Sequence, residues 1–497
     1  MTSNVTEVST PAGVALGVVR DNVRIFRGIR YGCTQAGAGR FQEVKPFRNG
    51  NGPISEKYSV FPQLRSRLAD VMGDAVRDIT QAEDAFLLDV WTPADASRLP
   101  VLVFLHGGAF ISGGGCGTRY DGFRLASEES VVVVTLNYRL GAMGHLFIDG
   151  VSHGNLPFGD ILCALQWVQE NVGSFGGDPA NVTVAGQSAG AWYAHLLAVS
   201  PASRGLLRRN VLLSIPHYPP MPADTARETG RFFTSLPGGS DPHTMPVDTL
   251  LAAQREVMTR AARFGDLTLG FYPVVDGDVV PEWLFDYRRA AEAAHVETTL
   301  VGYTRDENAA FLSISGFSMP PDEHAVTEWF RDKFGSMAEV VRSNLDRLRD
   351  RPSPYTSLVD GGTWLSFALP AHALVDACSQ RGIRSWLYRF DLPTGSEDIL
   401  SPHCLELPFL FGNREDWDDA RMLARISPRI FEAVSSAFRH AIARFVHGEL
   451  PASRSGNAWD EYSAQTKRCN LVTAESEPFS TRLDLSDTVQ CVLAQRG

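Results

Sequence analysis

The sequence Gly-Gln-Ser-Ala-Gly at residues 186–190 is typical of a turn that carries a nucleophilic serine. A serine hydroxyl is a poor nucleophile at neutral pH, so it needs a base within reach and surroundings that favour negative charge. An exposed corner at the N-terminus of a helix provides both, because a base can reach it and the helix dipole favours negative charge there. Ser188 is therefore the first candidate catalytic residue.

The segments around Ser188 have the order that such a turn requires. Apolar residues at Val182, Val184 and Ala185 predict a buried strand that leads into the turn, and an apolar helix follows Ser188. A helical stretch and a loop precede that strand. The five-residue pattern alone arises often by chance in a chain with 44 glycines. The order of helix, loop, strand and turn is what favours a nucleophile over a surface Gly-Ser turn.

Donors for the negative charge of an oxyanion are predicted after another apolar run. The sequence Leu-His-Gly-Gly-Ala-Phe at residues 105–110 follows a run of strand length, so the backbone N–H groups of Gly108 and Ala109 can approach a ligand closely. The N–H group of Ala189, next after the nucleophile, would be the third donor. His106 is interpreted as a residue that positions this loop.

A catalytic serine also needs an acid and a base, and candidates follow it along the chain. A strand predicted to end at Gly302 brings Asp306 and Glu307 to its carboxyl end, where ligand-facing residues of such sheets gather. The residues alone do not choose between these two carboxylates. Of the twelve histidines, His403 is the candidate base, because it lies on a polar loop between a strand-like and a helix-like run. A single loop histidine is more often a surface residue.

The composition excludes several classes of partner. The 497 residues include 46 basic and 57 acidic side chains, which gives a net charge of −11, and the basic residues form no stripe. We therefore expect neither nucleic acid nor a membrane as a partner. The first residues do not combine a basic region with an apolar one, and the longest apolar runs have only strand length. We expect a cytoplasmic protein, and the residues say nothing of its oligomeric state.

The cysteines are odd in number and lack the close pairing of metal ligands. This pattern argues against a zinc site and against a disulfide framework, and we expect most of them to be reduced thiols. We expect no metal and no organic cofactor. The seven residues are Cys33, Cys116, Cys163, Cys378, Cys404, Cys469 and Cys491.

Strand-like runs alternate with helical ones, which predicts an α/β sheet covered by helices on both faces. Residues 217–275 are rich in proline and are predicted to be irregular until strand character resumes at 271–281. Residues 311–370 are predicted to be more helical. Insertions of these two kinds commonly form lids or pocket walls.

Taken together, the motifs resemble those of the type-B carboxylesterases, the family of cholinesterases and of bacterial esterases active on p-nitrobenzyl esters. The resemblance covers nearly the whole chain. It implies a single α/β-hydrolase domain over residues 1–497, with a large, mostly parallel mixed sheet, helices on both faces and pocket-forming insertions at about 217–275 and 311–370. The motifs that carry it are FRGIRYG, EDAFLLDVWTP, LHGGAF, TLNYRLGAMG, FGGDPANVTVAGQSAGA, TRDEN and HCLELPFLFGN.

Transferred by position, the resemblance also assigns roles to the candidate residues. Ser188 would be the nucleophile, His403 the general base and Glu307, rather than Asp306, the acid. The oxyanion hole would be formed by Gly108, Ala109 and Ala189.

The chain departs from the family pattern at several places. Alanine ends the sequence Glu-Asp-Ala at residues 83–85, where secreted members have a cysteine, so their disulfide cannot form and a reducing compartment is favoured. Gln187 replaces a glutamate that often precedes the nucleophile, which should weaken any preference for cationic substrates. Cys404 directly follows the predicted base and is interpreted as a packed thiol.

We therefore expect an enzyme that hydrolyses a small to medium, largely neutral carboxylic ester through an acyl-enzyme. A carbamate or anilide hydrolase with the same triad is the nearest alternative, suggested by Gln187 and by the pair His403 and Cys404. A biosynthetic acyltransferase or cyclase, and a non-catalytic adhesion or binding protein on the same fold, are further alternatives.

Overall fold

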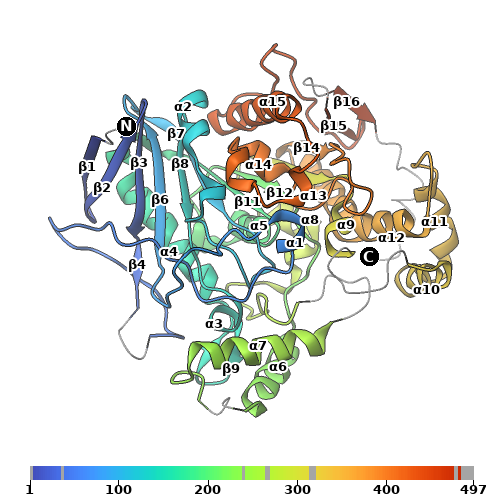
Figure 1. Cartoon of the computed structure of the whole chain (residues 1–497), viewed down its shortest axis with the longest axis horizontal. Coiled ribbons are helices and arrows are strands. Elements are labelled where there is room, and N and C mark those ends of the chain that lie inside the picture. The colour runs from blue at the N-terminus through green and yellow to red at the C-terminus, as the bar shows by residue number, and fades with distance from the viewer. Residues whose placement is uncertain are drawn as a thin grey trace.

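A large mixed sheet forms the centre of the computed structural model, which describes residues 4–34, 39–237, 241–262, 269–312, 321–474 and 479–482. Figure 1 shows the sheet crossing the molecule between layers of helices. In spatial order its 12 strands are β1 (Asn4–Thr10), β2 (Gly13–Arg20), β3 (Val23–Arg30), β6 (Leu87–Pro93), β8 (Val132–Leu136), β7 (Leu99–Leu105), β11 (Gly177–Gln187), β12 (Arg209–Leu213), β13 (Thr298–Thr304), β14 (Arg384–Phe390), β15 (Arg468–Val472) and β16 (Phe479–Arg482).

The sheet is parallel in its centre and antiparallel towards both edges. The strands from β8 to β15 in this order run parallel to their neighbours, and the outer pairs run antiparallel. Parallel strands are covered on both faces, so they are apolar along their whole length. In β7, Val101 and Val103 belong to one buried cluster, whereas Leu102 and Phe104 belong to another. The predicted α/β sheet is confirmed.

Helices cover both faces of the sheet, as predicted. The first cluster contains residues of α4 (Leu156–Asn171), α5 (Ala189–Val199), α8 (Tyr287–Ala293) and α13 (Leu369–Gln380). The second contains residues of α2 (Phe123–Glu129), α14 (Glu406–Phe411) and α15 (Pro428–His447). The β-strand side chains therefore alternate between two helical layers, which fixes the register of every central strand.

The region over residues 217–275 differs from the prediction. About half of it folds into the helices α6 (Ala223–Ser235) and α7 (Val247–Ala261) instead of remaining irregular. Pro222 and Pro246 stand at the N-caps of these helices, so the prolines mark where helices begin. The strand expected over 271–281 is also not formed, because Val274 makes only an isolated bridge to Met221. Figure 1 shows α6 and α7 side by side, in green below the sheet.

The region over residues 311–370 is mainly helical where it is described, as predicted. Its helices α10 (Glu323–Phe334), α11 (Ala338–Asp346) and α12 (Pro354–Thr363) lie on the opposite side of the molecule from β1 (Figure 1). The remaining α-helices and strands of the described chain are short. They are β4 (Gly32–Cys33), β5 (Lys45–Pro46), α1 (Ala69–Met72), α3 (Gly141–His145), β9 (Phe147–Ile148), β10 (Ser152–His153) and α9 (Glu307–Leu312).

The six cysteines in the described ranges are unbridged, and all except Cys33 are buried. Cys491 lies outside the described residues. Among the helices of the described chain, none combines the length and apolar character needed to cross a membrane.

Candidate active site

Ser188 lies between the end of β11 and the start of α5, at the turn that the sequence predicts. Its backbone has φ 55° and ψ −120°, a conformation that costs a non-glycine residue on the order of 1–3 kcal/mol. A Cβ on Gly186 would lie 2.2 Å from the Gly190 carbonyl oxygen, and one on Gly190 would lie 2.0 Å from the Leu105 carbonyl oxygen. The glycines around Ser188 are therefore required by close packing of strand, turn and helix.

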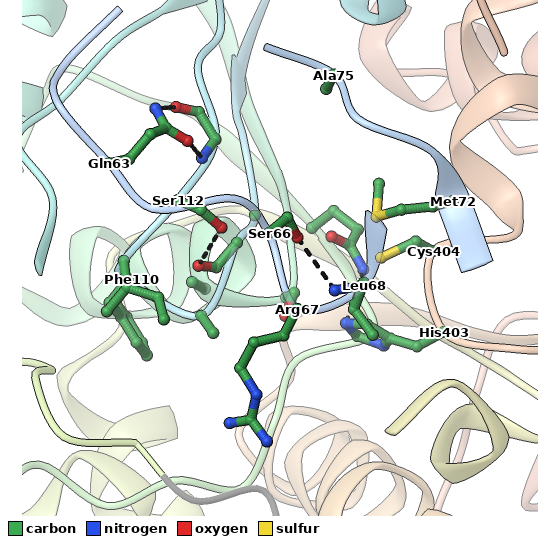
Figure 2. Close-up of a pocket in the computed structure, with 18 of the residues that line it drawn as sticks. Gln63, Ser66, Arg67, Leu68, Met72, Ala75, Phe110, Ser112, His403 and Cys404 are labelled. Atoms are coloured by element: carbon green, nitrogen blue, oxygen red, sulfur yellow. Dashed lines mark hydrogen bonds between the residues drawn. The ribbon is translucent and has the colours of Figure 1, made fainter. Parts of the chain in front are cut away.

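The loop after β7 lines the central pocket. Gly108 has φ 120° and Ala109 has φ 54°, so both have a left-handed backbone. The Gly108 carbonyl oxygen accepts from the N–H groups of Ile111 and Ser112 at 3.1 and 3.0 Å, which closes the loop into a tight turn. Ala189, the first residue of α5, lines the same pocket. All three predicted oxyanion donors therefore belong to residues around one cavity, the one shown in Figure 2.

His403 and Glu307 are hydrogen-bonded to each other, although their positions in the sequence differ by 96 residues. His403 Nδ1 donates to Glu307 Oε2, and both side chains are buried. Glu307 is the first residue of α9, beyond the carboxyl end of β13, and its Oε1 accepts from the Thr304 N–H at 2.7 Å. A neutral histidine with its proton on Nδ1 has a lone pair on Nε2, which is the form that a general base requires.

Asp306, the other carboxylate that the residues left open as the acid, has different partners. It pairs with Arg349, which also pairs with Asp360. Its Oδ2 accepts from the Ser401 N–H at 3.1 Å. Asp306 therefore anchors the loop that leads to His403 and does not meet the imidazole.

Ser188, His403 and Gln187 line the same pocket. The amide of Gln187 donates from Nε2 to His403 Nε2 over 3.1 Å. Gln187 is buried, so it places a neutral group against the nitrogen that would take the Ser188 proton. Gln187, which departs from the family pattern, is therefore in direct contact with the candidate base.

Two phenylalanine rings pack against His403, and neither is predicted from the sequence. Phe311 of α9 and Phe367 of the π-helical turn η6 (Trp364–Ala368) each have their ring centroid 5.1 Å from that of the imidazole. These rings restrict how the imidazole can turn. Phe311 lies four residues after Glu307, so helical spacing could have placed it on the same face. Phe367 carries no comparable signal.

Glu406, at the start of α14, is a second buried carboxyl near the candidate triad. Its Oε1 accepts from the Ser214 hydroxyl at 3.0 Å. Burial, followed by the negative charge of Glu307, raises the pKa of Glu406 to about 7, although His403 and Ser214 act in the opposite direction. Its position three residues after His403, on an apolar helix, is the signal that could have identified it.

Glu406→Gln is expected to change how stability depends on pH. The folded-state pKa lies above the usual value of 4.5, so the folded protein holds a proton that the unfolded chain has lost, and stability falls as pH rises from about 4.5 to 7. The glutamine side chain does not titrate, so the variant does not lose stability in this way as pH rises. Relative to wild type, its free energy of unfolding should therefore increase by about 2–3 kcal/mol between pH 5 and pH 8. Urea unfolding at both pH values measures this.

The matched control for this experiment is Glu256→Gln, which changes an exposed glutamate of α7. The difference in free energy of unfolding between this variant and wild type should be the same at both pH values. A Glu406→Gln profile that runs parallel to that of wild type would show that Glu406 does not titrate in this range.

The pocket lies beyond the carboxyl ends of β7 and β11, where ligands of such sheets bind. It holds about 960 Å³ free of protein atoms, part of it open to solvent. In the described part of the chain, no three His, Cys, Asp or Glu side chains gather as metal ligands would. The charged lining residues are Arg67 and Asp74, and the apolar ones include Leu68, Met72, Phe110, Leu269 and Phe311.

Cys404 stands in the pocket wall, close to Met72 in Figure 2. Its backbone has φ 73°, and its side chain is buried. Burial, together with the charges of Glu406 and Glu307, raises the pKa of this thiol well above its usual value. Cys404 is therefore a neutral thiol at physiological pH, which agrees with a packing role.

The chain matches known proteins over nearly its whole length. The family model described as "Carboxylesterase family" matches residues 4–488. A probable N-octanoylanthranilate hydrolase, AqdA2 of Rhodococcus erythropolis, is 33% identical over 94% of this chain and 98% of its own. Phenmedipham hydrolase of Pseudarthrobacter oxydans is 27% identical over 97% of each chain. The structure of a thermophilic PNB esterase superposes with a TM-score of 0.83 at 29% identity, covering 98% of this chain and 99% of its own.

Proposed function

The chain belongs to the carboxylesterase family and is a carboxylic ester hydrolase, and we propose that it cleaves its ester with Ser188 as nucleophile, His403 as general base and Glu307 as the acid that orients His403. The observation that carries this proposal is the hydrogen bond from His403 Nδ1 to Glu307 Oε2, because His403 also lines the pocket that contains Ser188. A base held by an acid beside a serine is what acyl transfer requires.

The proposed reaction has two matching halves. Ser188 Oγ attacks the ester carbonyl carbon while His403 Nε2 takes its proton, and His403 then gives that proton to the departing alcohol oxygen. Water next attacks the acyl-enzyme in the same way, releasing the carboxylic acid and restoring the Ser188 hydroxyl. Glu307 keeps the His403 proton on Nδ1 and stabilises the imidazolium that forms in each half. Gln187 must yield its place at Nε2 when Ser188 engages the base.

The N–H groups of Gly108, Ala109 and Ala189 would bind the oxyanion of each tetrahedral intermediate. The left-handed backbone at Gly108 and Ala109, and the position of Ala189 at the start of α5, support this assignment. In other hydrolases, removing one such donor costs about 3 kcal/mol of transition-state stabilisation.

We propose that the substrate is a small to medium, largely neutral ester, because the pocket wall is mainly apolar. A series of p-nitrophenyl esters from acetyl to palmitoyl tests this. We expect kcat/KM to rise from acetyl to a maximum between butanoyl and octanoyl and then to fall, since the pocket has a limited volume. A profile that keeps rising to palmitoyl would contradict a small or medium acyl group.

Hydrolysis of an amide or a carbamate by the same residues is the second candidate. Two relatives favour it by name, one for N-octanoylanthranilate, an amide, and one for phenmedipham, a carbamate. Matched esters, anilides and carbamates with the same acyl group separate the two candidates. Ester turnover far above that of the anilide and carbamate supports the first candidate, and comparable rates support the second.

Gln187→Glu is expected to increase the preference for cationic esters. The change places a negative charge in the buried site beside His403, where a positive substrate group would be attracted. The ratio of kcat/KM for a choline ester to that for its uncharged 3,3-dimethylbutyl analogue should rise about tenfold. An unchanged ratio would show that this position does not affect charge selection.

We further propose that residues 1–497 form one domain whose two insertions contribute to the pocket. Leu269, from the first insertion, and Phe311, from the second, both line it. The alanine at position 85 and the unbridged cysteines of the described ranges are compatible with the reducing conditions of the cytoplasm.

A further inference from the structure

We propose that Gln63 is a positioning residue that sets the geometry of the oxyanion hole through Gly113, an inference that rests on the function proposed above. Gln63 is 5% exposed and lies in the pocket wall. Its side-chain amide pairs with both backbone groups of Gly113. The Gly113 N–H donates to Gln63 Oε1 at 2.6 Å, and Gln63 Nε2 donates to the Gly113 carbonyl oxygen at 2.8 Å. Figure 2 marks hydrogen bonds at the side-chain amide of Gln63 with dashed lines.

Gly113 packs directly against the residues that precede the oxyanion donors. Its backbone has φ 112°, which favours glycine. A Cβ at this position would lie 2.4 Å from His106 Nδ1 and 2.5 Å from the Gly107 carbonyl oxygen. Gly113 therefore has no room to move toward the loop, and Gln63 keeps it from moving away.

The neighbouring residue Ser112 connects Gly113 to the donor peptides themselves. A Cβ on Gly108 would lie 1.9 Å from the Ser112 carbonyl oxygen. The Ser112 N–H also donates to the Gly108 carbonyl oxygen, whose peptide plane contains the N–H of Ala109. A shift of Gly113 would therefore turn the peptide that presents Ala109 to the substrate.

Gln63 is itself fixed by two further hydrogen bonds. Its Nε2 also donates to the Phe61 carbonyl oxygen at 3.0 Å, and its backbone N–H donates to Gln81 Oε1 at 2.9 Å. Glutamine suits this position because one side chain supplies the acceptor for the Gly113 N–H and donors for two carbonyl groups. A carboxylate would face those two carbonyls without a donor, and a hydrocarbon would leave both groups of Gly113 unpaired.

The experiment compares Gln63→Leu and Gln63→Glu with wild type, using p-nitrophenyl butanoate, a trifluoromethyl ketone and the matching methyl ketone. The trifluoromethyl ketone forms a tetrahedral adduct whose oxyanion occupies the hole, whereas the methyl ketone binds in the ground state. We expect kcat to fall about tenfold to a hundredfold with little change in KM. Affinity for the trifluoromethyl ketone should fall by a similar factor, and affinity for the methyl ketone should not.

Gln169→Leu is the matched control. It removes a half-buried glutamine of α4 whose Nε2 donates to the Pro179 and Leu206 carbonyl oxygens at 2.9 and 3.2 Å, away from the pocket, so all three measurements should stay near those of wild type. If Gln63→Leu does not fold, Gln63→Glu carries the test, because it has the same shape and still accepts from the Gly113 N–H.

The inference is overturned if either Gln63 variant folds and binds the trifluoromethyl ketone as wild type does. It is also overturned if both ketones lose affinity equally, or if Gln169→Leu shows the same loss, since either result indicates general loosening of the protein. The Ser188→Ala variant distinguishes failure of the proposed function from failure of the inference about Gln63. Full activity in that variant would refute the proposed function, whereas its inactivity alongside unaffected Gln63 variants would refute only the role of Gln63.

Discussion

Replacing Ser188 with alanine is expected to lower kcat for p-nitrophenyl butanoate by a factor on the order of 10⁶. The variant keeps the proposed oxyanion donors and the pair of His403 and Glu307 but has no atom that can form the acyl-enzyme. Loss of the nucleophile alone costs other serine hydrolases about as much as loss of the whole triad. Stability should change little, because alanine occupies the same turn without the hydroxyl. Initial rates and thermal unfolding measure the two effects.

A covalent label provides the control for this prediction. Diethyl p-nitrophenyl phosphate should add one diethylphosphoryl group to the wild-type protein, on the peptide that contains Ser188, and none to the Ser188→Ala variant. Activity that survives the substitution, or a label found on another serine, would place the nucleophile elsewhere.

The local part of the site could be predicted from the sequence because its causes are local. The turn at Ser188 depends on Gly186 and Gly190, where close packing leaves no room for a side chain, and on the apolar strand directly before it. The loop at Gly108 depends in the same way on the strand that ends at Leu105. The prolines of residues 217–275 did not reveal the helices there, because proline can either begin a helix or interrupt one.

The long-range part of the site could not be predicted from the residues alone. Asp306 and Glu307 are adjacent, and only the fold brings Arg349 to the first and His403 to the second. Gln63 reaches Gly113 across 50 residues, and nothing near either residue signals the contact. Such contacts depend on how whole strands and helices pack, so residue spacing cannot reveal them. The resemblance to a family supplied the choice of Glu307.

Glu307→Gln is expected to lower kcat by about 10⁴-fold while leaving the fold intact. The Thr304 N–H donates to Oε1 at 2.7 Å, so the oxygen of the new amide will stay at Thr304 and its NH₂ group will face His403. That NH₂ group donates to Nδ1 and drives the imidazole proton to Nε2. The histidine then presents an N–H to Ser188 instead of a lone pair and cannot act as the base.

Asp306→Asn is the matched variant, because it makes the same chemical change at the adjacent carboxylate. It should cost about 2 kcal/mol of stability, since Arg349 loses one of its two buried acidic partners, while kcat stays within about tenfold of wild type. Steady-state kinetics and urea unfolding on both variants measure the pattern. The reverse pattern, with activity lost at Asp306 and stability lost at Glu307, would make Asp306 the acid. The two variants thus distinguish a catalytic contact from a structural one, because Glu307 pairs with His403 whereas Asp306 pairs with Arg349.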